Sequence, residues 1–189
     1  MVETRGTAES SPTVVEAYRD YAPPPTFRRL VQNLLKAVPR RYFLGLKTII
    51  LTNQPGESRD RKRQKVWSRN RKIRLVDARG YYSPATRTSE ASIVLHVDNI
   101  LRGMRPWELK APLLCYEPLA TVLYHEIGHH IHAEHKPVYK GKENVAEDWS
   151  GKLSGRFYRR HYWYLMPLFY PIWFLNKAYR WMARRNMPE

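Results

Sequence analysis

The chain has 189 residues, enough for one domain with a substantial core but tight for two. Its 33 Lys and Arg residues outnumber 17 Asp and Glu residues, so the formal net charge is +16 at pH 7. Such a charge favours polyanionic partners, meaning nucleic acid or an anionic membrane surface. A lone cysteine, Cys115, excludes an intrachain disulfide and lies in an apolar stretch typical of a buried small residue. The amino-terminal residues lack a secretory signal pattern, so we expect a cytoplasmic protein, either free or peripheral at the membrane.

The first half of the chain predicts a tail, a helix, a strand and a basic segment. Residues 1–22 are polar and precede a run of prolines, so we expect a flexible tail. Residues 27–39 place apolar side chains at helical spacing and end in proline. Residues 46–53 are apolar and β-branched, which predicts a buried strand. Residues 53–72 are rich in arginine and lysine, which predicts an exposed loop or a hairpin arm.

The second half predicts two more strands and two helices. Residues 73–85 and 91–101 alternate between apolar and polar side chains, as strands do. Residues 111–135 carry an apolar stripe at helical spacing, and residues 143–160 resume that spacing. This order of elements predicts an α+β fold.

The predicted helix 111–135 contains an H-E-x-x-H pattern formed by His125, Glu126 and His129. Residues four apart lie on one helical face, so both imidazoles can reach one metal ion from the same side. A catalytic zinc ion takes three protein ligands and keeps one position for water. Glu126 can take a proton from the metal-bound water and so make it a nucleophile. The pattern therefore predicts a Zn²⁺ cofactor, with Glu126 as general base and acid.

Three residues compete to be the third zinc ligand. His135 extends the pattern to H-E-x-x-H-x-x-H-x-x-H, which resembles the metzincins, although His132 stands where that family has a turn glycine. Glu143 and Glu147 instead lie one turn apart on one face of the next predicted helix. An antiparallel return of that helix would bring Glu147 level with His129, so the spacing leaves both glutamates open.

The residues after the H-E-x-x-H pattern resemble the gluzincin metallopeptidases, whose third ligand is a glutamate on a following helix. Several gluzincin families place alanine three residues after this glutamate, an acidic residue or asparagine four after it, and an aromatic residue six after it. Here these positions are Glu143, Ala146, Glu147 and Trp149. The resemblance, which covers about residues 45–157, implies that Glu143 binds zinc and that Glu147 orients one of the histidines. It also implies hydrolysis of peptide bonds by zinc-bound water.

The resemblance implies a small zincin-like single domain over residues 23–160. Its mixed or antiparallel sheet would precede an active-site helix and a glutamate-bearing helix. Residues 91–101 would then be the edge strand that pairs with an extended peptide or protein substrate. Tyr124, Tyr139 and the tyrosines near the carboxyl end are candidates for polarising the oxyanion.

Two other segments predict different partners. Residues 59–74 cluster basic side chains around Trp67, and they either bind nucleic acid through phosphate contacts and base stacking or form a solvated loop. Residues 161–189 form an aromatic and basic C-terminal segment that either packs on the domain or meets an anionic lipid interface. The alternative to a peptidase is therefore a basic nucleic-acid- or membrane-surface-binding module whose metal is structural or absent.

Overall fold

The computed structural model of the chain describes residues 11–57, 60, 63–68, 71–135 and 142–165. The strands are β1 Thr13–Ala17, β2 Leu46–Thr52, β3 Lys65–Ser68, β4 Arg71–Arg74, β5 Gly80–Ser83 and β6 Ala91–His96. The helices are α1 Phe27–Leu35, α3 Val97–Ile100, α4 Pro106–Leu109, α5 Pro112–His135 and α6 Lys142–His161. Short 3-10 turns cover Arg40–Phe43, Gln54–Gly56, Leu75–Asp77 and Trp163–Leu165. The chain divides into two compact units, Met1–Ser154 and Gly155–Glu189, and the sheet with α1 to α5 belongs to the first.

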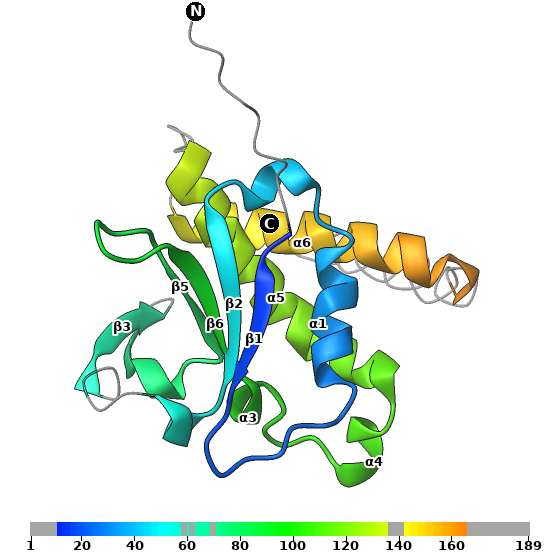
Figure 1. Ribbon diagram of the computed structural model, residues 1–189. Helices are drawn as coiled ribbons and strands as arrows, with labels where there is room; N and C mark the ends of the chain where they lie inside the picture. The colour runs from blue at the N-terminus through cyan, green and yellow to red at the C-terminus, as the bar shows by residue number, and fades with distance from the viewer. Residues whose placement is uncertain (1–10, 58–59, 61–62, 69–70, 136–141, 166–189) are drawn as a thin grey trace, which may run out of the picture. The chain divides into compact units, whose positions relative to one another are not determined.

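A mixed sheet of four strands, in the order β1-β2-β6-β5, forms the first layer of this unit (Figure 1). β1, β2 and β6 run parallel, and β5 pairs antiparallel with β6. The apolar and β-branched sequences of β2 and β6 suit these central positions, where each strand pairs on both edges and β6 is almost entirely buried. A mixed sheet combined with helices makes the domain α+β, as the order of elements in the sequence predicted.

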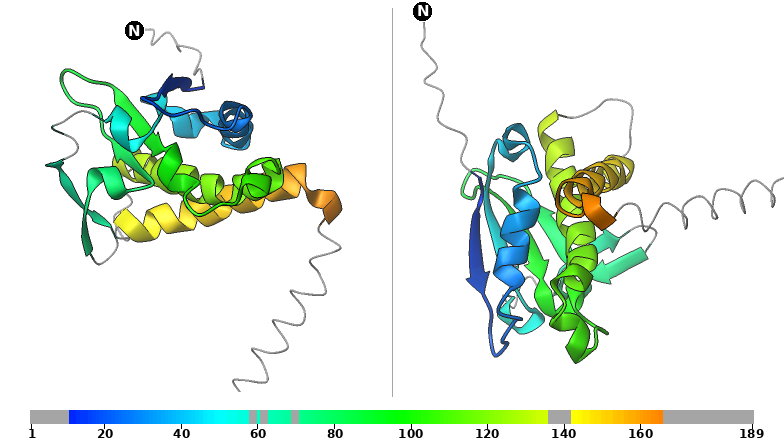
Figure 2. Two further views of the ribbon diagram at one scale, coloured as in Figure 1. Left: turned by 90° about the horizontal axis from the view of Figure 1, so that it is seen from below. Right: turned by 90° about the vertical axis from the view of Figure 1, so that its right-hand side faces the viewer.

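The second layer consists of helices on one face of the sheet. Figure 2 shows α1 and α5 on this face and the first half of α6 on the side of α5 turned away from the sheet. The residues of β2 and β6 that face the helices are fully buried. α1 meets them through the predicted apolar stripe, which is entirely buried and comprises Phe27, Leu30, Val31, Leu34 and Leu35. The core of the unit therefore lies between the sheet and α1 and α5.

A second, polar cluster joins the start of the basic segment to the sheet. The fully buried His96, at the end of β6, places its Nδ1 2.9 Å from the Ala78 carbonyl oxygen and its Nε2 3.2 Å from Glu57 Oε1. Tyr81 donates its hydroxyl proton to the same Glu57 oxygen, at 2.9 Å. Because a buried carboxylate needs such partners, this cluster holds Glu57 against the sheet.

The amino-terminal part of the sheet differs from the prediction. Residues 13–17, expected within a flexible tail, form β1 and pair with β2. The stretch is short and flanked by polar residues, so its own composition indicates little. Its backbone hydrogen bonds are made with a strand more than thirty positions away, which a local pattern does not reveal.

Two predicted strands are also shorter than expected. The stretch 73–85 divides into the end of β4, a 3-10 turn and β5, and the turn is closed by an ion pair of 2.8 Å between Arg74 Nε and Asp77 Oδ2. The stretch 91–101 ends as a strand at His96 and continues as α3, where the Asn99 side chain donates to the carbonyl of Val76 at 2.7 Å. At the second place a polar side chain therefore satisfies a backbone carbonyl that lies outside the sheet ladder.

The basic segment contains β3 and β4, which pair antiparallel and so correspond to the hairpin arm rather than to an irregular loop. Most of the aromatic and basic C-terminal segment, residues 166–189, lies outside the described residues. Within the part of the chain that the structure describes, no helix combines the length and apolar character needed to cross a bilayer.

Candidate metal centre

The structure brings His125, His129 and Glu143 together between α5 and α6. Each contributes one possible ligand atom, and these atoms all lie within 4.8 Å of one another. Glu143 Oε2 is 3.5 Å from His125 Nε2, and Glu143 Oε1 is 3.7 Å from His129 Nε2. The centroids of the His125 and His129 rings are 4.6 Å apart, and the ring planes are nearly perpendicular, at 82°. Two imidazoles and one carboxylate thus converge on one point.

These separations fit a shared metal ion. Ligand atoms placed roughly 2.1 Å from a tetrahedral ion lie about 3.4 Å from one another. The two measured nitrogen-to-oxygen distances, 3.5 and 3.7 Å, are close to this edge length. They exceed the range of about 2.7–3.2 Å typical of an N–H···O hydrogen bond. Donor type, donor number and these two distances are compatible with a shared metal ion, so the group could hold a metal.

Burial places the group at the border between core and solvent. His129 is buried, His125 is partly buried and Glu143 is about half exposed. One side of the group therefore faces the protein and the other faces solvent. A catalytic metal site needs this arrangement, because one coordination position must stay open to water and substrate.

The two faces of α5 have different roles. The side chains of Leu119, Leu123 and Ile127 are fully buried and face the sheet side. His125 and His129 lie on the opposite side of the helix, toward α6, because helical positions repeat every 3.6 residues. α5 is therefore covered on both sides, and this fixes the direction in which the imidazoles project.

A close helix crossing sets the distance between the histidines and Glu143. A Cβ atom added to Gly128 would lie 2.6 Å from the Ala146 Cα, so only glycine permits this approach of α5 and α6. Ser150 Oγ also donates to the Thr121 carbonyl oxygen at 3.3 Å. Ser150 lies about one turn after Ala146 on α6, and Thr121 lies about two turns before Gly128 on α5. The alanine three residues after Glu143 thus faces the glycine between Glu126 and His129.

Of the other predicted site residues, Glu126 is buried in α5 directly after His125. Glu147 is exposed, and among the described residues the metal-binding group does not include it. His135 is the last residue of α5, and its side chain lies outside the described residues, as does Tyr139. The structure therefore places Glu143, and not Glu147, beside the two histidines.

Tyr124 was a candidate for polarising the oxyanion, and the structure contradicts this. Its side chain is fully buried, and its hydroxyl donates to the Leu34 carbonyl oxygen of α1 at 2.9 Å. Tyr124 follows Leu123 on the core side of α5, so it cannot face the metal group. Its role is to join α5 to α1.

The predicted edge strand is also wrong. Residues 91–96 form β6, which lies between β2 and β5 in the interior of the sheet. β5 is instead the last strand of the described sheet on this side. The apolar sequence of β6, buried on both faces, already suits an interior position.

His130 makes a polar connection that the sequence did not indicate. His130 is buried, with its Nδ1 3.2 Å from the Tyr82 hydroxyl of β5 and its Nε2 2.9 Å from the Leu44 carbonyl oxygen. A carbonyl only accepts, so His130 Nε2 carries a proton and donates it to the Leu44 carbonyl oxygen. Burial, and to a smaller extent Glu134, raises the pKa of Tyr82, which keeps this hydroxyl protonated. One bond joins α5 to β5 and the other joins it to the segment before β2. The neighbouring histidines in the sequence offered no signal that separates this role from metal binding.

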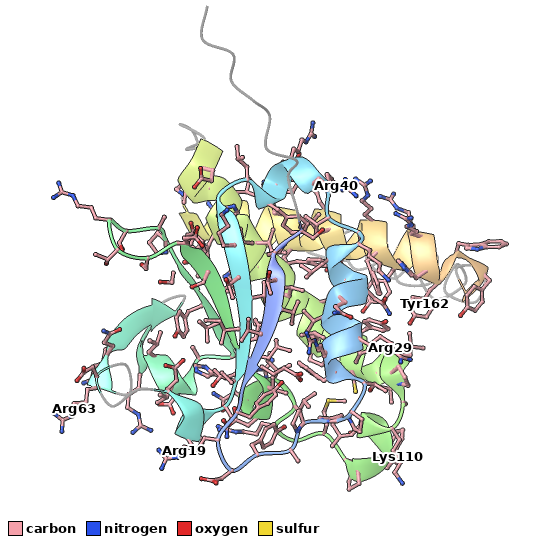
Figure 3. All side chains as sticks on the ribbon, viewed as in Figure 1. Arg19, Arg29, Arg40, Arg63, Lys110 and Tyr162 are labelled. Carbon is pink, nitrogen blue, oxygen red and sulfur yellow. The ribbon has the colours of Figure 1, made fainter. Side chains whose placement is uncertain are left out.

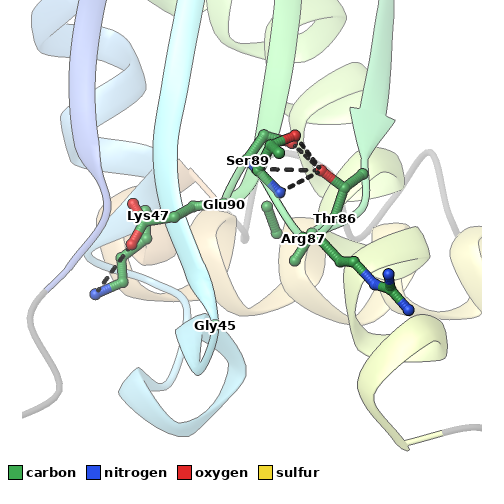
Figure 4. Close-up of a pocket in the computed structure, with 9 residues that line it drawn as sticks. Gly45, Lys47, Thr86, Arg87, Ser89 and Glu90 are labelled. Carbon is green, nitrogen blue, oxygen red and sulfur yellow. Dashed lines mark hydrogen bonds and ion pairs between the residues drawn. The ribbon is translucent and has the colours of Figure 1, made fainter.

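An open pocket of about 350 Å³ lies beside the start of β2 and the loop between β5 and β6 (Figure 4). It is lined by Gly45, Lys47 and residues 85–91. Lys47 Nζ lies 3.9 Å from Glu90 Oε1, so the charge of this lysine is balanced within the lining. None of the three residues of the metal group lines this pocket.

Fold and site together define an α+β domain in which the longest helix of the described residues presents two histidines to a glutamate of the next helix. No protein-family model, no curated protein and no solved structure matches the chain. Its function is therefore argued from the residues of the site.

Proposed function

We propose that this protein is a zinc-dependent peptidase with a zincin-like fold of the gluzincin type. The observation that carries the proposal is the convergence of His125, His129 and Glu143 at the spacing of metal ligands, with Glu126 next to the first histidine. A purely structural cluster would not require an acid at the second position of H-E-x-x-H.

In this proposal His125, His129 and Glu143 hold the ion. When bound, a zinc ion supplies Lewis acidity, which lowers the pKa of water and polarises a carbonyl group. Ala146 and Gly128 keep α6 close enough for the Glu143 carboxylate to reach the histidines. Trp149, six residues after Glu143, stacks edge-on against Tyr42, with 4.6 Å between ring centroids, and so fixes the rotation of α6.

Glu126 is the proposed general base and acid. As a base it takes a proton from the attacking water, and as an acid it gives that proton to the amine that leaves. Its place in α5, directly after His125, supports this role, because it keeps the carboxyl group next to the proposed ligands.

The edge of the sheet supports a peptide as substrate. A Cβ atom added to Gly80 of β5 would lie 2.8 Å from Val122 Cγ1, so β5 lies directly against α5. Val122 precedes Glu126 by one turn and shares its side of the helix. An extended peptide that pairs with β5 would therefore run past Glu126, which is how a peptidase presents a backbone carbonyl to its site.

Metal analysis of the purified protein tests the ligands. We expect one zinc ion per chain, lost in His125→Ala, His129→Ala and Glu143→Ala and kept in Glu147→Ala. Loss of zinc in Glu147→Ala with retention in Glu143→Ala would exchange the roles of the two glutamates. Absence of zinc in the wild type after reconstitution would contradict the proposal.

Hydrolysis of a fluorogenic peptide library tests the reaction. We expect Glu126→Gln to abolish cleavage while its zinc content equals that of the wild type, because the amide cannot accept the proton. If the wild-type protein holds zinc but cleaves no peptide, the metal site exists without peptidase activity, and the peptidase proposal is refuted.

A further inference from the structure

A small apolar surface lies at the corner between α4 and α5, far along α5 from the metal group. Trp107 is 57% exposed, Leu113 is 43% exposed and Leu114 is 41% exposed. We name these three residues the corner patch. They fall within eight positions of one another, across the end of α4 and the first turn of α5.

Backbone hydrogen bonds close the corner, so the three exposed side chains stand on a defined part of the fold. The Lys110 N–H donates to the Trp107 carbonyl at 3.2 Å, and the Leu114 N–H donates to the Ala111 carbonyl at 3.0 Å. Pro106 and Pro112 begin the two helices, where proline suits the first helical position. Cys115 and Tyr116, the next two residues, are buried and hold the corner on the domain.

Basic side chains surround the corner patch. Arg102, Arg105 and Lys110 are exposed in the same segment, and Figure 3 shows Lys110 at the outer end of the corner. The acidic side chains of the segment are Glu108 and Glu117, of which Glu108 accepts a hydrogen bond from the Arg105 backbone N–H. The cations of this region therefore outnumber its acids, in a chain whose formal net charge is +16.

The size and composition of the patch decide between possible partners. With usual side-chain areas, the three exposed fractions correspond to roughly 300 Å² of exposed apolar surface. This area is well below the approximately 800 Å² that each partner buries in a stable protein interface. Nucleic acid would use the tryptophan for stacking but not two adjacent leucines. Tryptophan prefers the headgroup level of a bilayer, leucine enters the acyl region, and arginine and lysine pair with anionic headgroups.

We propose that the corner patch docks this protein on an anionic lipid bilayer, with Trp107, Leu113 and Leu114 inserted and the surrounding basic residues at the headgroups. Docking of this kind is peripheral and requires no membrane-crossing helix. The proposal goes beyond the peptidase proposal and does not depend on it.

A fluorescent label at one position tests insertion directly. The native cysteine Cys115 is buried, so a new surface cysteine in Leu113→Cys can be labelled selectively with a polarity-sensitive dye. We expect its emission to shift to the blue with phosphatidylcholine–phosphatidylserine vesicles, and to shift far less with phosphatidylcholine alone or at high salt. The same label at Thr88→Cys, an exposed position in the loop between β5 and β6, should not shift. A label at Leu113→Cys that does not respond to the anionic vesicles would overturn the proposal.

Vesicle sedimentation with patch variants separates this surface from other basic or aromatic segments of the chain. We expect Trp107→Ser combined with Leu113→Ser and Leu114→Ser to weaken binding at least tenfold, while zinc content and circular dichroism stay as in the wild type. Arg105→Glu with Lys110→Glu should weaken binding to anionic vesicles in the same direction. Unchanged vesicle binding of the serine variant would show that another segment binds lipid. If the wild type were a dimer and the serine variant a monomer, the patch would instead be an interface between two copies of the chain. Either result overturns the proposal.

Discussion

At the scale of single residues, the candidate metal site depends on two small residues that are not among its possible ligands. Gly128 and Ala146 bring the backbones of α5 and α6 together at the level of the metal group. The carboxylate of Glu143 reaches two imidazoles on another helix because the helices lie this close. Gly128 and Ala146 therefore set the geometry of the site although neither is one of the three possible ligands.

Gly128→Ala should destabilise the protein and weaken metal binding, because the added methyl group meets the backbone of Ala146 and forces the helices apart. We expect the free energy of unfolding to fall by about 1–3 kcal/mol, as for other overpacked sites. Gly151→Ala on α6 is the matched control, since an added Cβ there has no atom within 4 Å. It should leave metal binding unchanged and raise stability by about 0.5–1 kcal/mol, because alanine favours a helix interior. Urea unfolding and zinc titration of both variants measure this, and equal behaviour of the two would refute the close-crossing argument.

His130 provides a second residue-scale prediction. His130→Ala removes a buried ring and leaves the Leu44 carbonyl and the Tyr82 hydroxyl without their partner, so stability should fall by about 2–3 kcal/mol. His132→Ala, at a half-buried position two residues on, should change stability by less than about 0.5 kcal/mol. Thermal unfolding of the two variants compares them. Similar losses in both would show that His130 does not hold β5 and α5 together.

At the scale of elements, β1 shows how pairing overrides local composition. β1 lies at the edge of the sheet and pairs with β2 along its whole length, from Thr13 opposite Thr48 to Ala17 opposite Thr52. Its two valines point to opposite faces, because successive side chains alternate in a strand. Val14 is 7% exposed and faces the helices, whereas Val15 is 41% exposed.

Val14→Ser should therefore cost about 1–2 kcal/mol of stability, because it removes buried apolar area and places a hydroxyl in the core. Val15→Ser makes the same chemical change on the other face and should cost less than about 0.5 kcal/mol. Denaturant midpoints of the two variants check the difference. If both valines could be replaced without loss, residues 13–17 would behave as the flexible tail that their composition predicts.

At the scale of the whole molecule, a metal ion held by α5 and α6 would join two helices that are separate in the unfolded chain. Binding to the folded state alone stabilises it by mass action, by about 2.7 kcal/mol at a free metal concentration one hundred times Kd. The ligands must lose their protons to bind, so proton and metal compete for the imidazoles.

We therefore expect zinc to raise Tm and a chelator to lower it in the wild type, with no effect of either in Glu143→Ala. Acidification protonates His125 and His129, so the zinc-dependent increase in Tm should be largest at neutral pH and decline as pH falls. Differential scanning calorimetry across pH measures both effects. An increase in Tm that zinc produces equally in Glu143→Ala would place the ion elsewhere.

The sequence by itself determined the features that depend on local spacing. His125 and His129 share a helical face because they are four residues apart, and α1 and α5 follow from apolar stripes that any helical segment must bury. The same holds for the α+β order of elements and for the burial of Cys115, which the structure confirms. These are short-range properties, and neighbours along the chain suffice to specify them.

Only the tertiary structure decided which distant groups meet. The angle and separation at which α6 crosses α5, set by Gly128 and Ala146, place Glu143 rather than Glu147 beside the histidines. Sheet order puts β6 in the interior and β5 at its edge, and the packing of α1 buries the hydroxyl of Tyr124 against Leu34. Each of these outcomes depends on contacts between residues far apart in the chain. The free energies of such contacts cannot be predicted from a local pattern of side chains.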